Sequence, residues 1–475
     1  PGALPKDDEF FKLARTEIDF KNATLSAFGS TRRPRVSVTE DPQLDALLAA
    51  ETEVICIVGK AWDYHVREAL RTDLDEGVAM VAESIEYLKR HDRRVFFDAE
   101  HFFDGFAGDP AFALAVLKAA HEAGAERLVL CDTNGGTLPH VVTSVIDRVH
   151  AAIPGAQLGV HFHNDAGTAV ASSLASAQAG ARQIQGCVNG YGERTGNADL
   201  CSIIPDLTIK MGIPVVSEEQ LAMLSPISHH VAEVVNITLD PHRPYVGASA
   251  FTHKAGLHTS ALARRPDAYE HASPSLVGNR TRMVVSEQAG RASIINKATE
   301  LGMAIDDDLA RTVLERVKEL EHNGYHFEAA DGSFELLVRR ATGWEQGYFQ
   351  LESFRAFIER RADEAVVAEA TVKVVVAGER MVTTGEGDGP VNALDRALRA
   401  ALLPHYPKVT ELRLTDFRVR VLDSADGTAA KVRVLIETSD SQGSWGTIGV
   451  HENIIEASWE ALVDGILVGL LRTGA

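Results

Sequence analysis

Cysteines, aromatic residues and long apolar runs are all scarce in this sequence. Four of the 475 residues are cysteine and 6% are aromatic. The cysteines show no CxxC spacing, which excludes a zinc ribbon and a disulfide-rich secreted scaffold, and we expect reduced thiols in a cytoplasmic protein. No run approaches the about 18 consecutive apolar residues of a transmembrane helix, so the sequence predicts no membrane-spanning segment.

Basic residues are also in deficit. The chain has 47 lysines and arginines against 67 aspartates and glutamates, which gives a formal charge of −20. A surface this acidic argues against binding to nucleic acid or to an anionic membrane. Hydrophobic residues make up 45% of the chain and charged residues 24%, as in an ordinary globular protein, and the length leaves room for more than one domain.

A βα rhythm occupies the first half of the chain. Apolar strand-like runs recur roughly every 30 residues, the period of a (β/α)8 TIM barrel, and amphipathic helical stretches such as residues 76–91 and 110–123 separate them. The runs begin near Thr24, Glu53, Val95, Arg127, Gln157 and Arg182. Polar residues follow most of them, as expected at the active-site end of such a barrel. An open flavodoxin-like sheet is the alternative, but it would normally bind its ligand at one switch point.

The number of predicted strands is too small for a closed barrel. We find six strand-like runs, whereas the fold needs eight. We therefore expect a TIM barrel that lacks its first two strands, with roughly 45–60 residues missing before residue 1. The strands near residues 24–30 and 182–190 would then lie at open edges and expose unpaired backbone groups.

The chain beyond the barrel changes character twice. We predict a partial barrel over residues 1–215, a mostly helical linker subdomain over 216–365, and a C-terminal α+β domain over 366–475. In the last part the patterns predict strands at 366–376, 411–422 and 430–438, and helices at 391–402 and 453–471. The glycine-rich segment 385–390 could bind a small ligand through backbone N–H groups, although a plain glycine turn is favoured.

Two histidines at the end of the fifth run suggest a metal site. His161 and His163 are one residue apart on a predicted strand, so both imidazoles point to the same face and form half of a divalent-metal site. Two hydrogen-bonded histidines at a polar strand end are the alternative. The next run is followed by a glycine-rich loop, in which Glu193 and Arg194 could pair and Asn197 offers an amide oxygen as a hard ligand.

Five motifs together resemble one enzyme family. They are DAEHFFDG (98–105), LCDTNGG (130–136), HFHND (161–165), GYGERTGN (190–197) and KAGLH (254–258). The resemblance is to the 2-isopropylmalate, homocitrate and citramalate synthases, which are acyl-CoA-dependent, Claisen-condensing TIM-barrel enzymes. It runs along essentially the whole chain, including a C-terminal module like the allosteric domain of the family. The details resemble the citramalate synthase branch most.

The resemblance implies a set of site residues. The metal, which would be Mn²⁺, Mg²⁺ or Zn²⁺, would be held by His161, His163 and Asn197. A further ligand of the family, an Asp within a TTLRDG motif, has no counterpart because that motif does not occur in this sequence. The catalytic residues implied are Glu100, His258 and Tyr269. The substrate-binding residues implied are Asp98, Thr133, Asn164, Glu193 and Arg194.

Structural readings of the same residues stay open. Glu100 could form a barrel-core carboxylate pair with Asp98, Thr133 could cap a strand end, and His258 could make an ordinary polar contact in a linker helix.

The implied reaction is the condensation of acetyl-CoA, a co-substrate, with pyruvate to give (R)-citramalate and CoA, in isoleucine biosynthesis. A base removes a proton from the acetyl methyl group, and a metal polarises the keto carbonyl. The resemblance also implies a homodimer with isoleucine as a possible effector. The alternatives are a 2-isopropylmalate synthase acting on 2-ketoisovalerate, a retro-aldol lyase of the same barrel type, and a non-catalytic amino-acid-binding relative.

Overall fold

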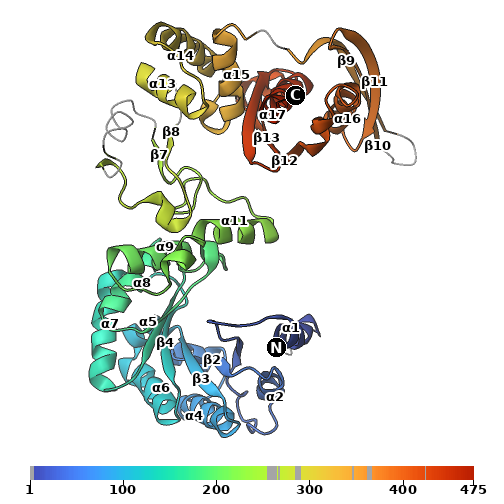
Figure 1. Cartoon of the computed structure of the whole chain (residues 1–475). Helices are drawn as coiled ribbons and strands as arrows, with labels where there is room; N and C mark the ends of the chain where they lie inside the picture. Colours follow the sequence, from blue (N-terminus) through green and yellow to red (C-terminus); the bar gives the residue numbers. More distant parts are fainter. Residues whose placement is uncertain are drawn as a thin grey trace. The chain divides into compact units, whose positions relative to one another are not determined.

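The computed structural model describes residues 5–253, 265, 268–283, 290–344, 347–360, 366–422 and 424–474 (Figure 1). The chain divides into two compact units, Pro1–Ala250 with Ala272–Arg280, and Phe251–His271 with Thr281–Ala475. Each unit is described below by itself. Among the described residues, no helix is both long and apolar enough to cross a bilayer.

The first unit is built on a parallel sheet whose strands follow one another in chain order. Within the described residues it has six strands, as the sequence predicts, and its edges are β1 and β6. The strands are β1 (Ser26–Ser30), β2 (Val54–Lys60), β3 (Arg94–Glu100), β4 (Arg127–Asp132), β5 (Leu158–Phe162) and β6 (Gln183–Gln185). The fold is therefore of the TIM-barrel type with an open, half-barrel sheet.

Side-chain alternation separates the two faces of this sheet. Ile57, Phe97, Leu130 and Val160 are fully buried in the core that the sheet forms with its helices. Burying each such side chain contributes about 1.5–3 kcal/mol. The residues between them point to the other face, which leaves polar groups there.

The described helices of this unit are α1 (Pro5–Glu17), α2 (Pro42–Ala49), α3 (Asp63–Glu68), α4 (Leu74–Arg90), α5 (Phe102–Gly108), α6 (Pro110–Glu122), α7 (Pro139–Ala152), α8 (Ala169–Gln178), α9 (Leu200–Pro205), α10 (Glu218–Leu221) and α11 (Leu224–Val234).

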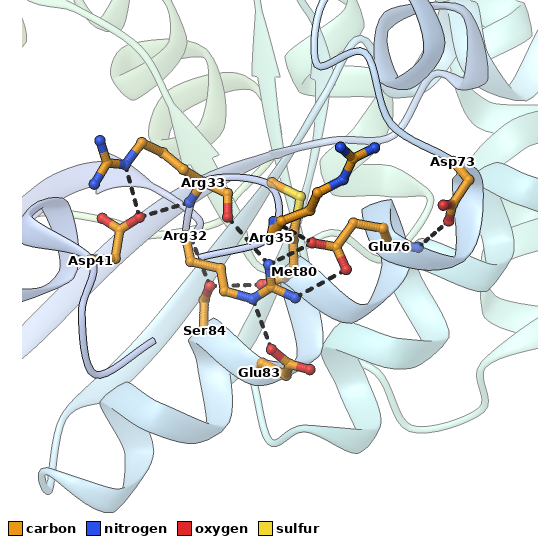
Figure 2. A network of polar contacts seen from close by, with 9 residues as sticks. All are labelled: Arg32, Arg33, Arg35, Asp41, Asp73, Glu76, Met80, Glu83 and Ser84. Carbon is orange, nitrogen blue, oxygen red and sulfur yellow. Dashed lines mark hydrogen bonds and ion pairs between the residues drawn. The ribbon is translucent and has the colours of Figure 1, made fainter. Parts of the chain in front are cut away.

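A buried arginine holds the loop that follows β1 (Figure 2). The Arg32 guanidinium donates to Glu76 Oε1 (2.7 Å) and to Glu83 Oε2 (2.7 Å), both on α4, and its backbone N–H donates to Ser84 Oγ. Next to it, the Arg33 backbone N–H donates to Asp41 Oδ2 at 2.7 Å, and Asp41 also caps α2. The loop is therefore fixed to two helices by charge-assisted hydrogen bonds.

Within its described residues, the second unit contains three helices, α13 to α15, and two three-stranded sheets with one further helix beside each. The helices are α13 (Arg291–Glu300), α14 (Asp307–His322), α15 (Asp331–Ala341), α16 (Pro390–Leu402) and α17 (Ile454–Thr473). In the first sheet the strands lie in the spatial order β11 (Glu379–Gly387), β10 (Val366–Val376) and β9 (Phe349–Arg360). In the second sheet the order is β12 (Arg413–Val421), β13 (Val432–Ser439) and β14 (Ser444–His451). A short ladder joins β7 (Thr252–His253) to β8 (Arg282–Met283).

Three strands of this unit lie where the sequence predicts something else or nothing. The linker is predicted to be mostly helical, yet residues 349–360 form β9, which pairs with β10 along its length. Charged residues interrupt the apolar alternation of β9, so its sequence lacks the regular pattern that predicts a strand. β11 and β14 are also absent from the prediction. Gly385 and Gly387 belong to β11 and are neither a turn nor a ligand loop, because a Cβ at Gly385 would lie 2.6 Å from the backbone N of Ala397 on α16.

Helices α13 to α15 share a core with the C-terminal sheet. Ile294, Val313, Phe334 and Ile448 lie in one buried cluster, and Ile448 belongs to β14. On α17, Asp464 accepts hydrogen bonds from Ser333 (2.8 Å) and Arg340 (3.1 Å) of α15. These contacts join α13 to α15 to the C-terminal part of the chain. The domain boundaries at residues 215 and 365 stay a prediction.

Candidate active site

The polar face of the first unit's sheet lines a cavity of about 650 Å³. Its walls come from alternate positions of consecutive strands, because side chains two residues apart share a face. The residues that carry candidate chemistry are Cys56, Asp98, Glu100, Cys131, Thr133, His161, His163 and Gln185. The cavity therefore gathers five of the predicted site residues from β3, β5 and the segments that follow β4 and β5. They are Asp98, Glu100, Thr133, His161 and His163.

The two histidine rings lie side by side, with their centroids 5.2 Å apart. Burial lowers the pKa of His161, and Asp98 nearby partly opposes the shift. Burial lowers the pKa of His163 as well, and the positive charge of Arg194 adds to that effect. Both imidazoles are thus neutral at pH 7, the form that binds a metal.

Asn197 approaches the histidine pair from the glycine-rich loop, although the cavity that it lines is a second one beside that loop. It forms a backbone bridge with His163, and its Nδ2 donates to the Tyr191 carbonyl at 2.9 Å. Its Oδ1 is buried and makes no hydrogen bond of good geometry, although the amide is close enough to His161 to raise the pKa of that imidazole. His163 Nδ1 is also buried without a partner. Two buried orphan acceptors are unusual unless something binds them.

These donors fit a divalent ion. Imidazole nitrogens and an amide oxygen are a suitable set for Mn²⁺ or Zn²⁺, and the amide oxygen also suits Mg²⁺. Within the part of the chain that the structure describes, no three His, Cys, Asp or Glu residues cluster in a way that would hold a metal. The set that fits here is therefore two imidazoles and an amide oxygen.

Asp98 is tied into the histidine pair by a residue that the sequence analysis missed. Gln185 Oε1 lies 2.9 Å from His161 Nδ1, and its Nε2 donates to Asp98 Oδ1 at 2.9 Å. The Cys56 thiol donates to the same oxygen at 3.1 Å. Burial raises the pKa of Asp98. The signal was present in the sequence, because Gln183 and Gln185 alternate on the run that follows the histidine strand.

Glu100 and Thr133 lie at the strand ends of the cavity. Glu100 forms an ion pair with Lys60, which comes from the end of β2. Thr133 Oγ1 accepts the backbone N–H of His101 at 2.9 Å, so its own hydroxyl proton remains available. Glu100 is thus held in place by a cation, and Thr133 is oriented by a main-chain donor.

Arg194 holds the glycine-rich loop through two ion pairs, the expected one with Glu193 and a closer one with Asp165. Arg194 makes two hydrogen bonds to Asp165 (2.8 and 3.0 Å) and a third to the Thr133 carbonyl (2.7 Å). Its distance to Glu193 is 3.7 Å, and the Glu193 side chain is 85% exposed. Asp165 is therefore the stronger partner, because a bidentate pair is the better geometry. The sequence analysis placed Asp165 in the HFHND motif without giving it this role.

Three further predicted residues lie elsewhere. Asn164 lines a second cavity of about 300 Å³ beside the loop, and its Oδ1 accepts the backbone N–H of Ala169 at 3.1 Å. Tyr269 belongs to the second unit and is 43% exposed. His258, with the KAGLH motif, lies outside the described residues.

Comparison with known proteins matches the chain to three domain models in order. They are HMGL-like (residues 17–237), homocitrate synthase post-HMGL domain-like (245–325) and LeuA allosteric (dimerisation) domain (328–468). The chain is 50% identical to the (R)-citramalate synthase of Aquifex aeolicus, over 99% of this chain and 90% of that protein. It is 53% identical to the (R)-citramalate synthase of Streptomyces coelicolor, over 100% of this chain and 89% of that protein. The chain belongs to the (R)-citramalate synthase family.

A curated relative at greater distance agrees with this family membership. The (R)-citramalate synthase of Sulfolobus acidocaldarius is 41% identical over 98% of this chain and 88% of that protein. Among solved structures, hydroxymethylglutaryl-CoA lyase from Pseudomonas aeruginosa aligns with a TM-score of 0.42 and 18% identity, over 55% of this chain and 80% of that chain. At that distance the solved structure says nothing about the site of this member of the (R)-citramalate synthase family.

Proposed function

We propose that this chain is an acyltransferase that condenses acetyl-CoA with pyruvate to give (R)-citramalate and CoA. The observation that carries the proposal is near-full-length identity of about one half to several (R)-citramalate synthases. The cavity is consistent with it, because it collects a histidine pair, a carboxylate and a hydroxyl donor on one face.

His161, His163 and Asn197 would hold a divalent metal. When bound, such an ion polarises the keto group of the substrate as a Lewis acid. The tie between Arg194 and Asp165 keeps the loop that carries Asn197 beside the histidine strand. The identity of the metal, among Mn²⁺, Mg²⁺ and Zn²⁺, is part of the proposal.

The remaining residues would handle the substrate and its proton. Thr133 would donate its free hydroxyl proton to the substrate carboxylate. Glu100 would take part in removing a proton from the acetyl methyl group, with Lys60 fixing its position. The new carbon–carbon bond then forms at the keto carbon, and hydrolysis of the thioester by water releases CoA as the thiol. His258 and Tyr269 remain proposed participants from the segment after residue 250.

The second unit would regulate and pair the chain. We place a homodimer contact and an effector site there, because residues 328–468 match a domain that is named for allostery and dimerisation. Isoleucine is the effector that we propose for this site. All four cysteines are free, which fits our proposal of a cytoplasmic location.

An assay with three keto acids tests the function. Release of the CoA thiol is followed with acetyl-CoA and pyruvate, 2-ketoisovalerate or 2-ketoglutarate, with and without a chelator. We expect pyruvate to be preferred over 2-ketoisovalerate by about tenfold or more in kcat/KM, because the larger acceptor must fit two extra methyl groups. Preference for 2-ketoisovalerate would identify a 2-isopropylmalate synthase, and no turnover with any acceptor would contradict an acyltransferase.

A further inference from the structure

One side chain bridges a histidine and a buried carboxylate inside the cavity. Gln185 contacts His161 Nδ1 through Oε1 and Asp98 Oδ1 through Nε2, each at 2.9 Å. We propose that Gln185 is a positioning residue that fixes His161 as the tautomer with its proton on Nδ1 and so directs Nε2 to a divalent cation. This inference rests on the proposed function, because it assumes that the cavity binds a metal.

The orientation of the Gln185 amide follows from its neighbours. Asp98 Oδ1 accepts from the Cys56 thiol at 3.1 Å as well as from Gln185, so this oxygen is an acceptor. Only the amide nitrogen of Gln185 can donate to it, which places the amide oxygen against His161. The reverse orientation would put two oxygens 2.9 Å apart, without a proton between them. Asp98 thus fixes Gln185, and Gln185 fixes the imidazole.

The orientation of the imidazole decides which nitrogen can ligate. An amide oxygen accepts only, so the Nδ1 that faces it must carry the proton. In the neutral ring the lone pair then lies on Nε2, which is therefore the nitrogen that can ligate a cation. Strand pairing keeps the two residues together, because His161 and Gln185 are direct partners in the β5–β6 register. Groups of this kind, which hydrogen-bond a metal-binding histidine, typically change metal affinity about 10- to 100-fold.

The matched control lies two residues away on the same strand and face. Gln183 also lines the cavity, but its Oε1 is buried without a hydrogen-bond partner. Gln185→Met and Gln183→Met therefore make the same chemical change, and only the first removes the contact to His161.

Two measurements on the whole chain test the inference. Titration calorimetry with Mn²⁺ should show affinity about 10- to 100-fold weaker in Gln185→Met and within about threefold of the unaltered chain in Gln183→Met. Long-range ¹H–¹⁵N spectra of the metal-free chain, assigned with His161→Asn, should show the His161 proton on Nδ1. In Gln185→Met it should move to Nε2 in part or completely.

The outcomes separate this inference from the function itself. Equal Mn²⁺ affinity in all three chains, or a proton on Nε2 of His161 in the unaltered chain, would overturn the role of Gln185 and leave the acyltransferase proposal standing. An unaltered chain that binds no Mn²⁺ would overturn the metal site, and with it this inference.

Discussion

His163 offers a buried nitrogen that nothing in the described protein satisfies. Oδ1 of Asn197, the residue whose backbone pairs with that of His163, is likewise buried without a hydrogen-bond partner. A buried acceptor without a hydrogen bond costs about 1–3 kcal/mol, so the pair is explained best by a ligand that both atoms share. The lowered pKa of His163 supports the same conclusion, because a neutral ring loses no binding to competing protons at pH 7.

Replacement of His163 should separate metal binding from folding. We expect His163→Ala to weaken Mn²⁺ binding by more than about 100-fold, beyond the usual effect of outer-shell residues, and to remove most CoA release. The free energy of unfolding should change by less than about 2 kcal/mol, because the packing lost with the ring is offset by removal of the unsatisfied Nδ1 acceptor. His140→Ala, at an exposed position at the start of α7, is the control. Unchanged Mn²⁺ affinity in His163→Ala would contradict the metal site.

At the scale of elements, the glycine-rich loop depends on one residue without a side chain. Gly196 has φ +91°, and a Cβ there would lie 2.1 Å from the carbonyl oxygen of Gly190. Any larger residue must therefore both adopt a strained conformation and push the loop apart. Because Asn197 is the next residue, its amide oxygen would move with the loop.

Gly196→Ala should therefore cost metal affinity as well as stability. Gly167→Ala is the matched control, since φ is +71° and nothing lies within 4 Å of its Cβ. Both variants should lose about 1–3 kcal/mol in urea unfolding from backbone strain, and only Gly196→Ala should also weaken Mn²⁺ binding. Equal Mn²⁺ affinity in the two variants would show that Asn197 does not contribute to the site.

The ion pairs after β1 make the free energy of unfolding of the first unit depend on pH. The hydrogen bond from Arg32 holds the pKa of Glu76 below its ordinary value near 4.5. A carboxyl with a depressed pKa in the folded state stabilises the protein above its unfolded pKa, and this stabilisation is lost as the pH falls through the folded pKa. Glu76→Gln should thus lower the free energy of unfolding by about 1–2 kcal/mol at pH 7 and by progressively less below pH 4.5.

Urea unfolding of both chains from pH 7 down to about pH 3.5 measures this difference, since the range extends from above the unfolded pKa of a glutamate, about 4.3, to below it. Glu86→Gln, at an exposed position on the same helix, should show no such dependence. A difference between Glu76→Gln and the unaltered chain that stays constant over this range would mean that the charge of Glu76 is not what stabilises the loop.

The elements that the sequence predicts well are those with strong periodicity. The six parallel strands and helix α4 follow directly from buried runs and helical spacing, and the HxH pair follows from alternation. β9 was predicted as part of a helical region, because its charged residues alternate with apolar ones only loosely. Gln185 and Asp165 were missed because their roles arise from contacts across strands, which spacing along one segment does not reveal.

For the whole molecule, one edge strand carries an apolar stripe. Phe417, Val419 and Val421 of β12 pair with positions of β13 that are buried or half-buried, yet are themselves 38%, 43% and 50% exposed. An edge strand with exposed apolar side chains is a favourable surface for another chain. The match of residues 328–468 to a dimerisation domain points to a second copy as that chain.

We therefore expect a dimer that a single charge on this stripe weakens. In Val419→Glu, sedimentation equilibrium should show that the dissociation constant of the dimer rises by tenfold or more, because burying the new carboxylate at the contact is unfavourable. Arg420→Glu places the same side chain on the opposite face of β12 and should stay dimeric. A monomeric unaltered chain, or an unchanged Val419→Glu dimer, would place the contact elsewhere.

Control by isoleucine requires a coupling between two sites. An effector inhibits only by binding one arrangement of the chain better than another, and the coupling is reciprocal in free energy. Removing residues 366–475 is a poor test of this coupling. The deletion would leave β9 without its partner β10, and it would remove Ile448 and so expose the apolar cluster that α13 to α15 form with it.

His163→Ala offers a test that leaves the second unit whole. We expect isoleucine to inhibit CoA release and to raise the Tm of the unaltered chain, by about 2.7 kcal/mol of stabilisation at one hundred times its Kd, with leucine weaker and alanine inactive. The same Tm rise should persist in His163→Ala, because the proposed effector site belongs to the second unit and the proposed metal ligands belong to the first. Loss of the isoleucine effect in that variant would mean competition at the active site, and no effect in the unaltered chain would leave the C-terminal module as a dimerisation domain alone.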